Sequence, residues 1–283
     1  SVNTPWRTLS HAVSAAATPA VIHLMPGNYS SSSGETYPIT LTGDVTVRST
    51  EGVATVSILG ATNQISLIVQ NGARLEDVTL RGGYAGVRVR RDPGEPKAEV
   101  VGVHARNAHD CIQAFDGIAR DCVFSNGWAP VVHVDGEFLM EDCVIAGGTQ
   151  FGINIPLHYG GNYGSMIMRR CEVIDCPGTG IQISDGGFSA ACDLLLEDCL
   201  VARNGYAGTF GWAGIQISGQ TVLSSTYHIR VVGSTIVGNK GPGIDNHGQA
   251  DVIIDSSVIA LNLSGDLAFG SAHVTNSLIG DAS

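Results

Sequence analysis

The pentapeptide "GIQIS" occurs twice, at residues 180–184 and 214–218, and it belongs to a repeat that runs through most of the chain. Segments such as "EDVTL", "RDCVF", "MEDCVI" and "LEDCLV" each place a small or apolar residue two positions before an aliphatic or aromatic one. The first of these two positions is occupied by Val78, Val103, Cys122, Cys143, Cys171, Cys199, Ser234, Ser257 and Ser277, at intervals of 19 to 35 residues. Such a repeat, with loops of unequal length on a constant core, requires neighbouring repeats to stack on one another.

Each repeat contains three short strands. The small or apolar residues from Val78 to Ser277 form one ladder of stacked positions. Three positions before each of them lies an apolar residue of a second ladder. Two residues that are usually polar separate the two ladders, as a bend between strands requires. This second ladder comprises Leu75, Val100, Ala119, Met140, Met168, Leu196, Val231, Ile254 and Val274. A third strand follows a glycine-containing turn and reads "GVRV", "CIQA", "VVHV", "GINI" and "GIQI" in successive repeats. About nine such coils predict a parallel β-helix rather than a β-propeller or a leucine-rich repeat, whose periods and motifs are missing.

Composition excludes several classes of partner and cofactor. The formal net charge of −11 argues against nucleic acid and membrane surfaces, which select a basic face, and the apolar runs are too short for membrane insertion. The seven cysteines lack paired Cys-x-x-Cys spacing, so neither a zinc site nor a complete disulfide framework is indicated. We interpret the cysteine column, formed by Cys122, Cys143, Cys171 and Cys199, as buried thiols stacked along the core. We expect no metal and no other cofactor; Ca²⁺ stays open as an alternative that the sequence does not indicate.

The first sixty residues differ from the repeats and are expected to close one end of the stack. Pro5 and Thr8 precede a short amphipathic pattern, which predicts an α-helical cap before a first strand at residues 21–25. We therefore divide a single domain, 1–283, into a cap with the first coils (1–60) and the repeated coils (61–283). The C-terminal segment offers no comparable cover, so we expect either more protein beyond it or a loop that folds back. Further domains of the same parent chain are therefore possible partners of this domain.

A family resemblance lies in the N-terminal segment "PGNYSSSSGETYPITL". It resembles the signature of a domain family of unknown function that opens many right-handed parallel β-helix proteins; the residues that match are Gly27, Tyr29, Gly34, Glu35, Tyr37, Pro38 and Ile39. The resemblance implies a right-handed, single-stranded β-helix of the superfamily that contains pectate lyases, polygalacturonases, alginate lyases, epimerases and phage tailspikes. Most of these are secreted and act on polysaccharides, so we expect an extracellular or cell-surface location. The epimerases' Asp-Pro-His-Asp motif is matched in "NAHD" only by His109 and Asp110.

The middle residue of each third strand is expected to point out to solvent and to form a polar strip. Its members are Arg88, Gln113, His133, Asn154, Gln182, Gln216 and Asp245, with His247 at the next outward position after Asp245. Glycine-rich loops on both sides carry the aromatic residues Trp128, Tyr159, Tyr163, Phe188, Phe210 and Trp212. Aromatic rings stack on sugars while polar groups bind hydroxyls, so the strip is a candidate substrate groove. The alternative is that the loops pack against the helix surface.

Two kinds of chemistry fit this strip. Asp135 and Asp185 lie two coils apart, roughly 9–10 Å at about 4.8 Å per coil, near the upper limit for an inverting hydrolase. A lyase needs a base, for which His133, His158 and His247 are candidates, and a cation such as Arg88 or Arg90 to neutralise a uronate. Arg81, Arg88, Arg90 and Arg91 are the only locally basic region. The sequence predicts a protein that binds and cleaves a polysaccharide or oligosaccharide; the alternative is a glycan-binding, adhesin-like or structural module.

Overall fold

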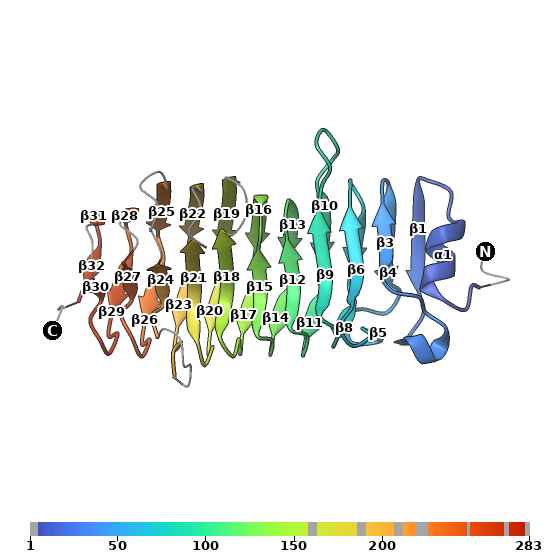
Figure 1. Ribbon diagram of the computed structural model, residues 1–283, viewed down its shortest axis with the longest axis horizontal. Helices are drawn as coiled ribbons and strands as arrows, with labels where there is room; N and C mark the ends of the chain where they lie inside the picture. The colour runs from blue at the N-terminus through green and yellow to red at the C-terminus, as the bar shows by residue number, and fades with distance from the viewer. Residues whose placement is uncertain are drawn as a thin grey trace.

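A computed structural model shows one short helix followed by a regular stack of parallel strands, with the two ends of the chain at opposite ends of the stack (Figure 1). The structure describes residues 5–157, 163–185, 191–206, 212–218, 226–247, 250–268 and 272–280. The strands form three parallel sheets, with 11, 11 and 10 strands in the described residues, and each coil contributes one strand to each sheet. This is the predicted parallel β-helix.

The elements have the following bounds. The helix α1 (Leu9–Ala15) precedes all strands, and a short 3-10 helix, η1 (Ser31–Ser33), lies in the first coil. Sheet A contains β1 (Ala20–Leu24), β4 (Val45–Ser49), β7 (Arg74–Glu76), β10 (Ala98–Val101), β13 (Gly117–Arg120), β16 (Gly136–Glu141), β19 (Tyr163–Arg169), β22 (Ala191–Glu197), β25 (Thr226–Val232), β28 (Asp251–Asp255) and β31 (Ala272–Thr275). Sheet B contains β2 (Gly27–Tyr29), β5 (Val56–Leu59), β8 (Thr79–Arg81), β11 (His104–Arg106), β14 (Val123–Ser125), β17 (Val144–Ala146), β20 (Glu172–Ile174), β23 (Leu200–Ala202), β26 (Thr235–Val237), β29 (Val258–Ala260) and β32 (Leu278–Ile279). Sheet C contains β3 (Ile39–Thr42), β6 (Ile65–Gln70), β9 (Ala85–Arg90), β12 (Asp110–Ala114), β15 (Ala129–His133), β18 (Phe151–Leu157), β21 (Thr179–Asp185), β24 (Ile215–Ser218), β27 (Ile244–Asn246) and β30 (Leu267–Ala268).

The strand register follows the apolar ladder that the sequence predicts. In sheet A, Val100 pairs with Leu75, and the same ladder continues without a shift through Val231, Ile254 and Val274. The nine coils counted from the sequence correspond to the levels from β7 to β31 in sheet A, and β1 and β4 add two more. Each level therefore repeats the same inward positions, and like residues stack along the core.

The cysteine column lies in this core as predicted. All seven cysteines are free and buried. Cys122 and Cys143 each donate their thiol to backbone carbonyls of their own and the preceding coil. Burial raises the thiol pKa of Cys111 and of Cys192 to about 12. Since the thiolate is the reactive form, these are inert structural groups.

An asparagine ladder, which the sequence reasoning missed, explains the glycines of the two "GIQIS" segments. Asn204 and Asn239 are fully buried in the turns between sheets B and C, and Asn204 donates its side-chain amide to Asn239 Oδ1 at 3.0 Å. A Cβ atom at Gly180 would lie 2.8 Å from Asn204 Nδ2, and one at Gly214 would lie 2.8 Å from Asn239 Nδ2. The backbone oxygens of Gly214 and Gly243 would lie closer still, at 2.5 and 2.7 Å from these two Cβ atoms. Glycine is required at both positions because the ladder and the backbone of the next coil occupy the space of a side chain.

The helix α1 covers the N-terminal end of the stack (Figure 1), as the sequence predicts. Its first two backbone N–H groups, of Leu9 and Ser10, donate to the carboxylate of Glu35 at 2.6 and 2.8 Å. Thr8 caps the same end by accepting a hydrogen bond from His11 N. A buried carboxylate at a helix N-terminus accepts hydrogen bonds from free N–H groups and interacts favourably with the helix dipole. Glu35 of the N-terminal signature therefore has a structural role.

Candidate functional site

The polar strip on the outer face of sheet C is in register at every level but one. Arg88 pairs with Gln113, and Asn154, Gln182, Gln216 and Asp245 follow one another in the same row. The level between Gln113 and Asn154 is occupied by Val132 and not by His133. The prediction that His133 points outward is therefore wrong.

His133 points into the core, where its side chain is fully buried. It pairs with the inward Ala114, whose carbonyl oxygen lies 3.2 Å from its Nδ1, and its ring lies 6.3 Å from that of Phe138. Burial, partly offset by the Ala114 hydrogen bond, lowers the pKa of His133 to about 4. No substrate on the outer face of sheet C could reach this imidazole.

The strip is also less exposed than a solvated face would be. Gln113, Gln182 and Asp245 are only 6, 6 and 7% exposed. Gln182 uses its amide in the strip itself, donating to Ser218 Oγ at 2.8 Å and to its own neighbour's carbonyl. Most of the strip therefore satisfies its own hydrogen bonds, and a ligand must be sought where the strip reaches solvent.

The strip reaches solvent at a hydrogen-bonded chain of four side chains, which come from β9, from β12 and from the residue just before β12. Arg88 donates from Nε and Nη2 to Gln113 Oε1, at 3.1 and 2.7 Å. Gln113 Nε2 donates to Asp110 Oδ2 at 2.7 Å, and Asp110 Oδ1 lies 2.7 Å from His109 Nδ1. The Asp110 side chain is 4% exposed, whereas that of His109 is 44% exposed. A buried carboxylate thus holds a histidine that remains accessible.

The contact with Asp110 fixes the tautomer of the His109 imidazole when the carboxylate is ionised. An ionised carboxylate only accepts hydrogen bonds, so His109 Nδ1 donates to Asp110. In the neutral ring the lone pair is then on Nε2, which makes this atom a proton acceptor oriented by its carboxylate partner. Burial, followed by the charge of Arg90, lowers the pKa of Arg88, and its guanidinium lies 5.3 Å from the ring of Phe115. A base and a cation are therefore placed at the two ends of one chain.

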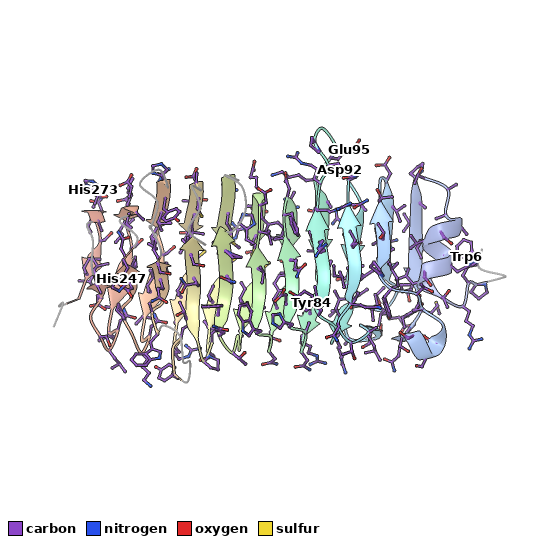
Figure 2. All side chains as sticks on the ribbon, viewed as in Figure 1. Trp6, Tyr84, Asp92, Glu95, His247 and His273 are labelled. Carbon is purple, nitrogen blue, oxygen red and sulfur yellow. The ribbon has the colours of Figure 1, made fainter. Side chains whose placement is uncertain are left out.

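An aromatic stack encloses His109 at the turn between sheets B and C. Its ring lies between those of Tyr84 and Trp128, with centroid distances of 5.1 and 5.0 Å and nearly parallel planes. Phe151 continues the stack edge-on to Trp128 at 5.3 Å. Trp128 therefore packs between His109 and Phe151, and Tyr84, which is 44% exposed and labelled in Figure 2, adds an accessible ring.

A second histidine–carboxylate pair lies further along the same face, nearer the C-terminal end (Figure 2). His247 Nε2 lies 3.1 Å from Asp245 Oδ1, and the His247 side chain is 48% exposed. Burial raises the pKa of Asp245, against the opposing effects of His247 and Gln216. This pair has no described aromatic stack comparable to that of His109.

The remaining predicted residues are only partly described. Asp135 follows β15, and its carboxylate accepts a hydrogen bond from Gly136 N at 2.7 Å. Asp185 and Tyr163 are described as backbone in β21 and β19, and their side chains are not. Trp212 is 50% exposed, with Lys240 Nζ 5.5 Å from its ring centre. The residues that lie outside the described part of the chain are His158, Tyr159, Phe188 and Phe210.

Sequence reasoning noticed His109 and Asp110 but did not assign them to the site. A stronger signal lies in the spacing: Tyr84, His109 and Trp128 each come six residues after a ladder position, Val78, Val103 and Cys122 respectively. Residues at one repeat position stack, so three rings at this position predict contact. The basic cluster, by contrast, is divided, because Arg81 lies in sheet B whereas Arg88 and Arg90 lie in sheet C.

The chain belongs to the family described as the right-handed β-helix region, whose model matches residues 45–259. Among solved structures it is similar to the A-module of the Azotobacter vinelandii mannuronan C-5 epimerase AlgE6, at 18% identity and a TM-score of 0.60, over 95% of this chain and 74% of that one. The pectate lyase Pel9A is 14% identical with a TM-score of 0.53, over 100% of this chain and 74% of that one. ORF18 of Geobacillus virus E2 is 10% identical with a TM-score of 0.54, over 92% of this chain and 53% of that one. These similarities establish the fold.

Three further findings concern relatives, membranes and metals. No curated protein matches the chain. Within the described residues, no helix has the length and apolar character needed to span a membrane. In the same ranges, no three side chains of His, Cys, Asp or Glu are grouped so that they could hold a metal ion.

Proposed function

We propose that the protein is a polysaccharide lyase that acts on a uronate-containing polymer over the turn between sheets B and C. The observation that carries this proposal is the chain Arg88–Gln113–Asp110–His109, which combines a cation with an oriented, accessible base. The fold supports it, because the similar structures include a mannuronan C-5 epimerase and a pectate lyase, whose named substrates are polyuronates. We propose further that the protein is secreted and that the reaction requires no cofactor.

The proposed reaction is a β-elimination. His109 Nε2 takes the proton from C5 of the uronate, the C4–O bond breaks, and a C4=C5 double bond forms. The departing oxygen takes a proton from solvent. Asp110 stabilises the imidazolium that results, and Arg88 neutralises charge on the uronate carboxylate. The rings of Tyr84 and Trp128 hold the imidazole in place and offer an apolar surface to a sugar.

The test is turnover of alginate and polygalacturonate, with a neutral glucan as the control substrate. The measurements are ultraviolet absorbance of the unsaturated uronate and release of reducing ends. His109→Asn is expected to lower kcat by about 100-fold or more, since general-base catalysis contributes about 10²–10⁴. Asp110→Asn should also lower it. His228→Asn is the matched control, because His228 lies 3.5 Å from Asp251 in an exposed pair on sheet A.

Each alternative has a distinct result. Reducing ends without an unsaturated product, lost in Asp135→Asn or Asp185→Asn, would identify a hydrolase and reject the lyase. A change in uronate composition without cleavage would identify an epimerase that uses the same base. Undiminished turnover in His109→Asn would reject this site.

A non-catalytic glycan-binding module is the second candidate. Tyr84, Tyr206 and Trp212 expose 44, 52 and 50% of their surface, and exposed rings are typical of sugar platforms. Binding of alginate or glucan without turnover of any substrate, weakened by Tyr84→Ala, would favour this function over the lyase.

A further inference from the structure

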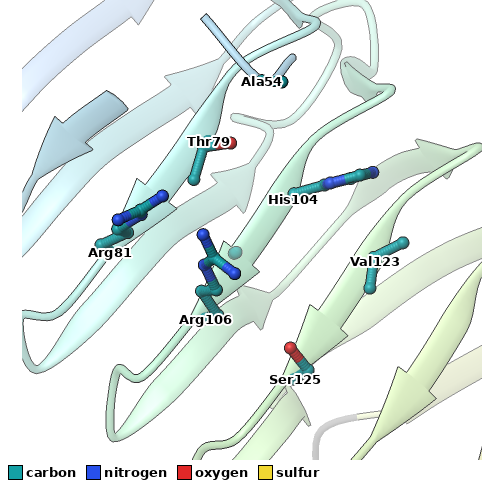
Figure 3. Close-up of a pocket in the computed structure, with 8 residues that line it drawn as sticks. Ala54, Thr79, Arg81, His104, Arg106, Val123 and Ser125 are labelled. Carbon is teal, nitrogen blue, oxygen red and sulfur yellow. The ribbon is translucent and has the colours of Figure 1, made fainter. Parts of the chain in front are cut away.

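A hollow of about 230 Å³ lies on the outer face of sheet B, away from the strip on sheet C (Figure 3). It crosses the strands β8, β11 and β14. The residues that line it are Ala54, Thr79, Arg81, His104, Ala105, Arg106, Val123 and Ser125. None of them belongs to the proposed lyase site.

Strand register places the polar residues of this hollow side by side. Arg106 pairs with Arg81 on one side and with Ser125 on the other, and His104 pairs with Thr79. Neighbouring strands lie about 4.8 Å apart, so two guanidinium groups occupy adjacent levels of one face. Figure 3 shows Arg81 and Arg106 on neighbouring strands, with Ser125 on the next.

These cations have no acidic partner in the described residues. Elsewhere in the chain arginines are paired with acids: Arg120 lies 2.7 Å from Glu141, and Arg169 lies 2.6 Å from Glu197, both on sheet A. The strands of sheet B from β2 to β17 contain no aspartate or glutamate. In a protein with a net charge of −11, two adjacent arginines with no counter-ion leave a local positive charge uncompensated.

The chemistry of the lining defines the ligand. Arg81 and Arg106 present only donors, and His104 and Ser125 add a ring N–H and a hydroxyl. Thr79 already donates its hydroxyl to Val53 O at 2.8 Å, so it is not part of this set. The volume corresponds to about eight waters at ~30 Å³ each, which admits one small group and not a run of sugar rings.

We propose that this hollow binds a single tetrahedral oxyanion, a sulfate or phosphate group, either free or as an ester on a sugar. Arginine forks match such oxygens with paired hydrogen bonds. Tyr84 and His109 follow Arg81 and Arg106 by three residues each, so the hollow adjoins the aromatic stack at the turn. A sugar ester held on that stack could place its anionic group here.

The test is titration calorimetry of the whole chain with inorganic sulfate and phosphate at low ionic strength, with chloride as the reference. Arg81→Gln and Arg106→Gln are each expected to weaken binding about 10-fold or more, as for a hydrogen bond to a charged group. Arg230→Gln is the matched control, because Arg230 is an exposed arginine on β25 of sheet A. Absence of saturable binding, or equal weakening by Arg230→Gln, would overturn the site.

Thermal unfolding gives an independent measurement. Sulfate should raise the Tm of the wild type more than that of Arg106→Gln at the same concentration, because the variant binds the anion more weakly. Without anion, Arg106→Gln should raise the Tm, because it removes a like-charge neighbour. A sulfated oligosaccharide that binds more tightly than sulfate assigns the group to a glycan, and the reverse assigns it to a small ion. Binding of the desulfated sugar with the same dependence on Arg106 would reject an oxyanion site. These results do not depend on whether the lyase proposal holds.

Discussion

The buried His133 predicts a measurable loss of stability in mild acid. In the folded protein its pKa is about 4, whereas the ordinary value is 6.5. Between these two values the unfolded chain binds a proton that the folded chain does not. Stability is therefore complete only well above pH 6.5, and it falls as the pH is lowered through 6.5 toward 4.

The size of this effect follows from the two pKa values. Linkage gives a very small cost at pH 7 and about 2 kcal/mol at pH 5, so the change over this range is about 2 kcal/mol. At about 2 °C per kcal/mol for a chain of this size, the Tm should fall by ~4 °C from this residue alone.

The assay compares the Tm of the wild type and of His133→Leu at pH 7 and pH 5 by circular dichroism. Leucine removes the titrating group and suits an inward position lined by Ala114 and Phe138. The Tm of the wild type should fall by ~4 °C more than that of the variant, whereas His273→Leu, at an exposed position on β31, should behave as the wild type. An equal fall in His133→Leu and the wild type would refute the buried placement of this histidine.

Three further predictions concern the cap, the asparagine ladder and the cysteines. Glu35→Gln should lower the free energy of unfolding by about 1 kcal/mol, measured by urea denaturation, because it weakens the bonds to Leu9 N and Ser10 N. Asn239→Ala should cost about 3 kcal/mol, because the backbone N and Nδ2 of Asn204 lose their acceptor, whereas the exposed Asn276→Ala should cost far less. A loss of under about 1 kcal/mol in Asn239→Ala would contradict the ladder. The seven cysteines should resist maleimide in the native protein and react in denaturant, since all are buried; rapid native labelling of any of them would show that the column is open.

The fold could be predicted because its information is local and repeated. Val231 and Ile254 pair as their ladder positions require, and an error at one level would conflict with its neighbours. The prediction of the outward residue is wrong in one coil, where the pattern is ambiguous. The segment "APVVHV" has apolar residues on both faces of the strand, so alternation alone does not show whether Val132 or His133 points outward. Pairing with Gln113 and Asn154 decides this register.

The sequence by itself determined which residues stack along the apolar ladders of sheets A and B, because each coil repeats the same short pattern and the core is the same at every level. Only the tertiary structure decided on which face each polar residue lies and what it touches. Arg81 and Arg88 are close in sequence, yet the turn between β8 and β9 directs them to different sheets. His109 contacts Asp110, Tyr84 and Trp128, which come from three coils. Contacts between coils depend on the turns and loops that set their relative position, and no single repeat contains that information.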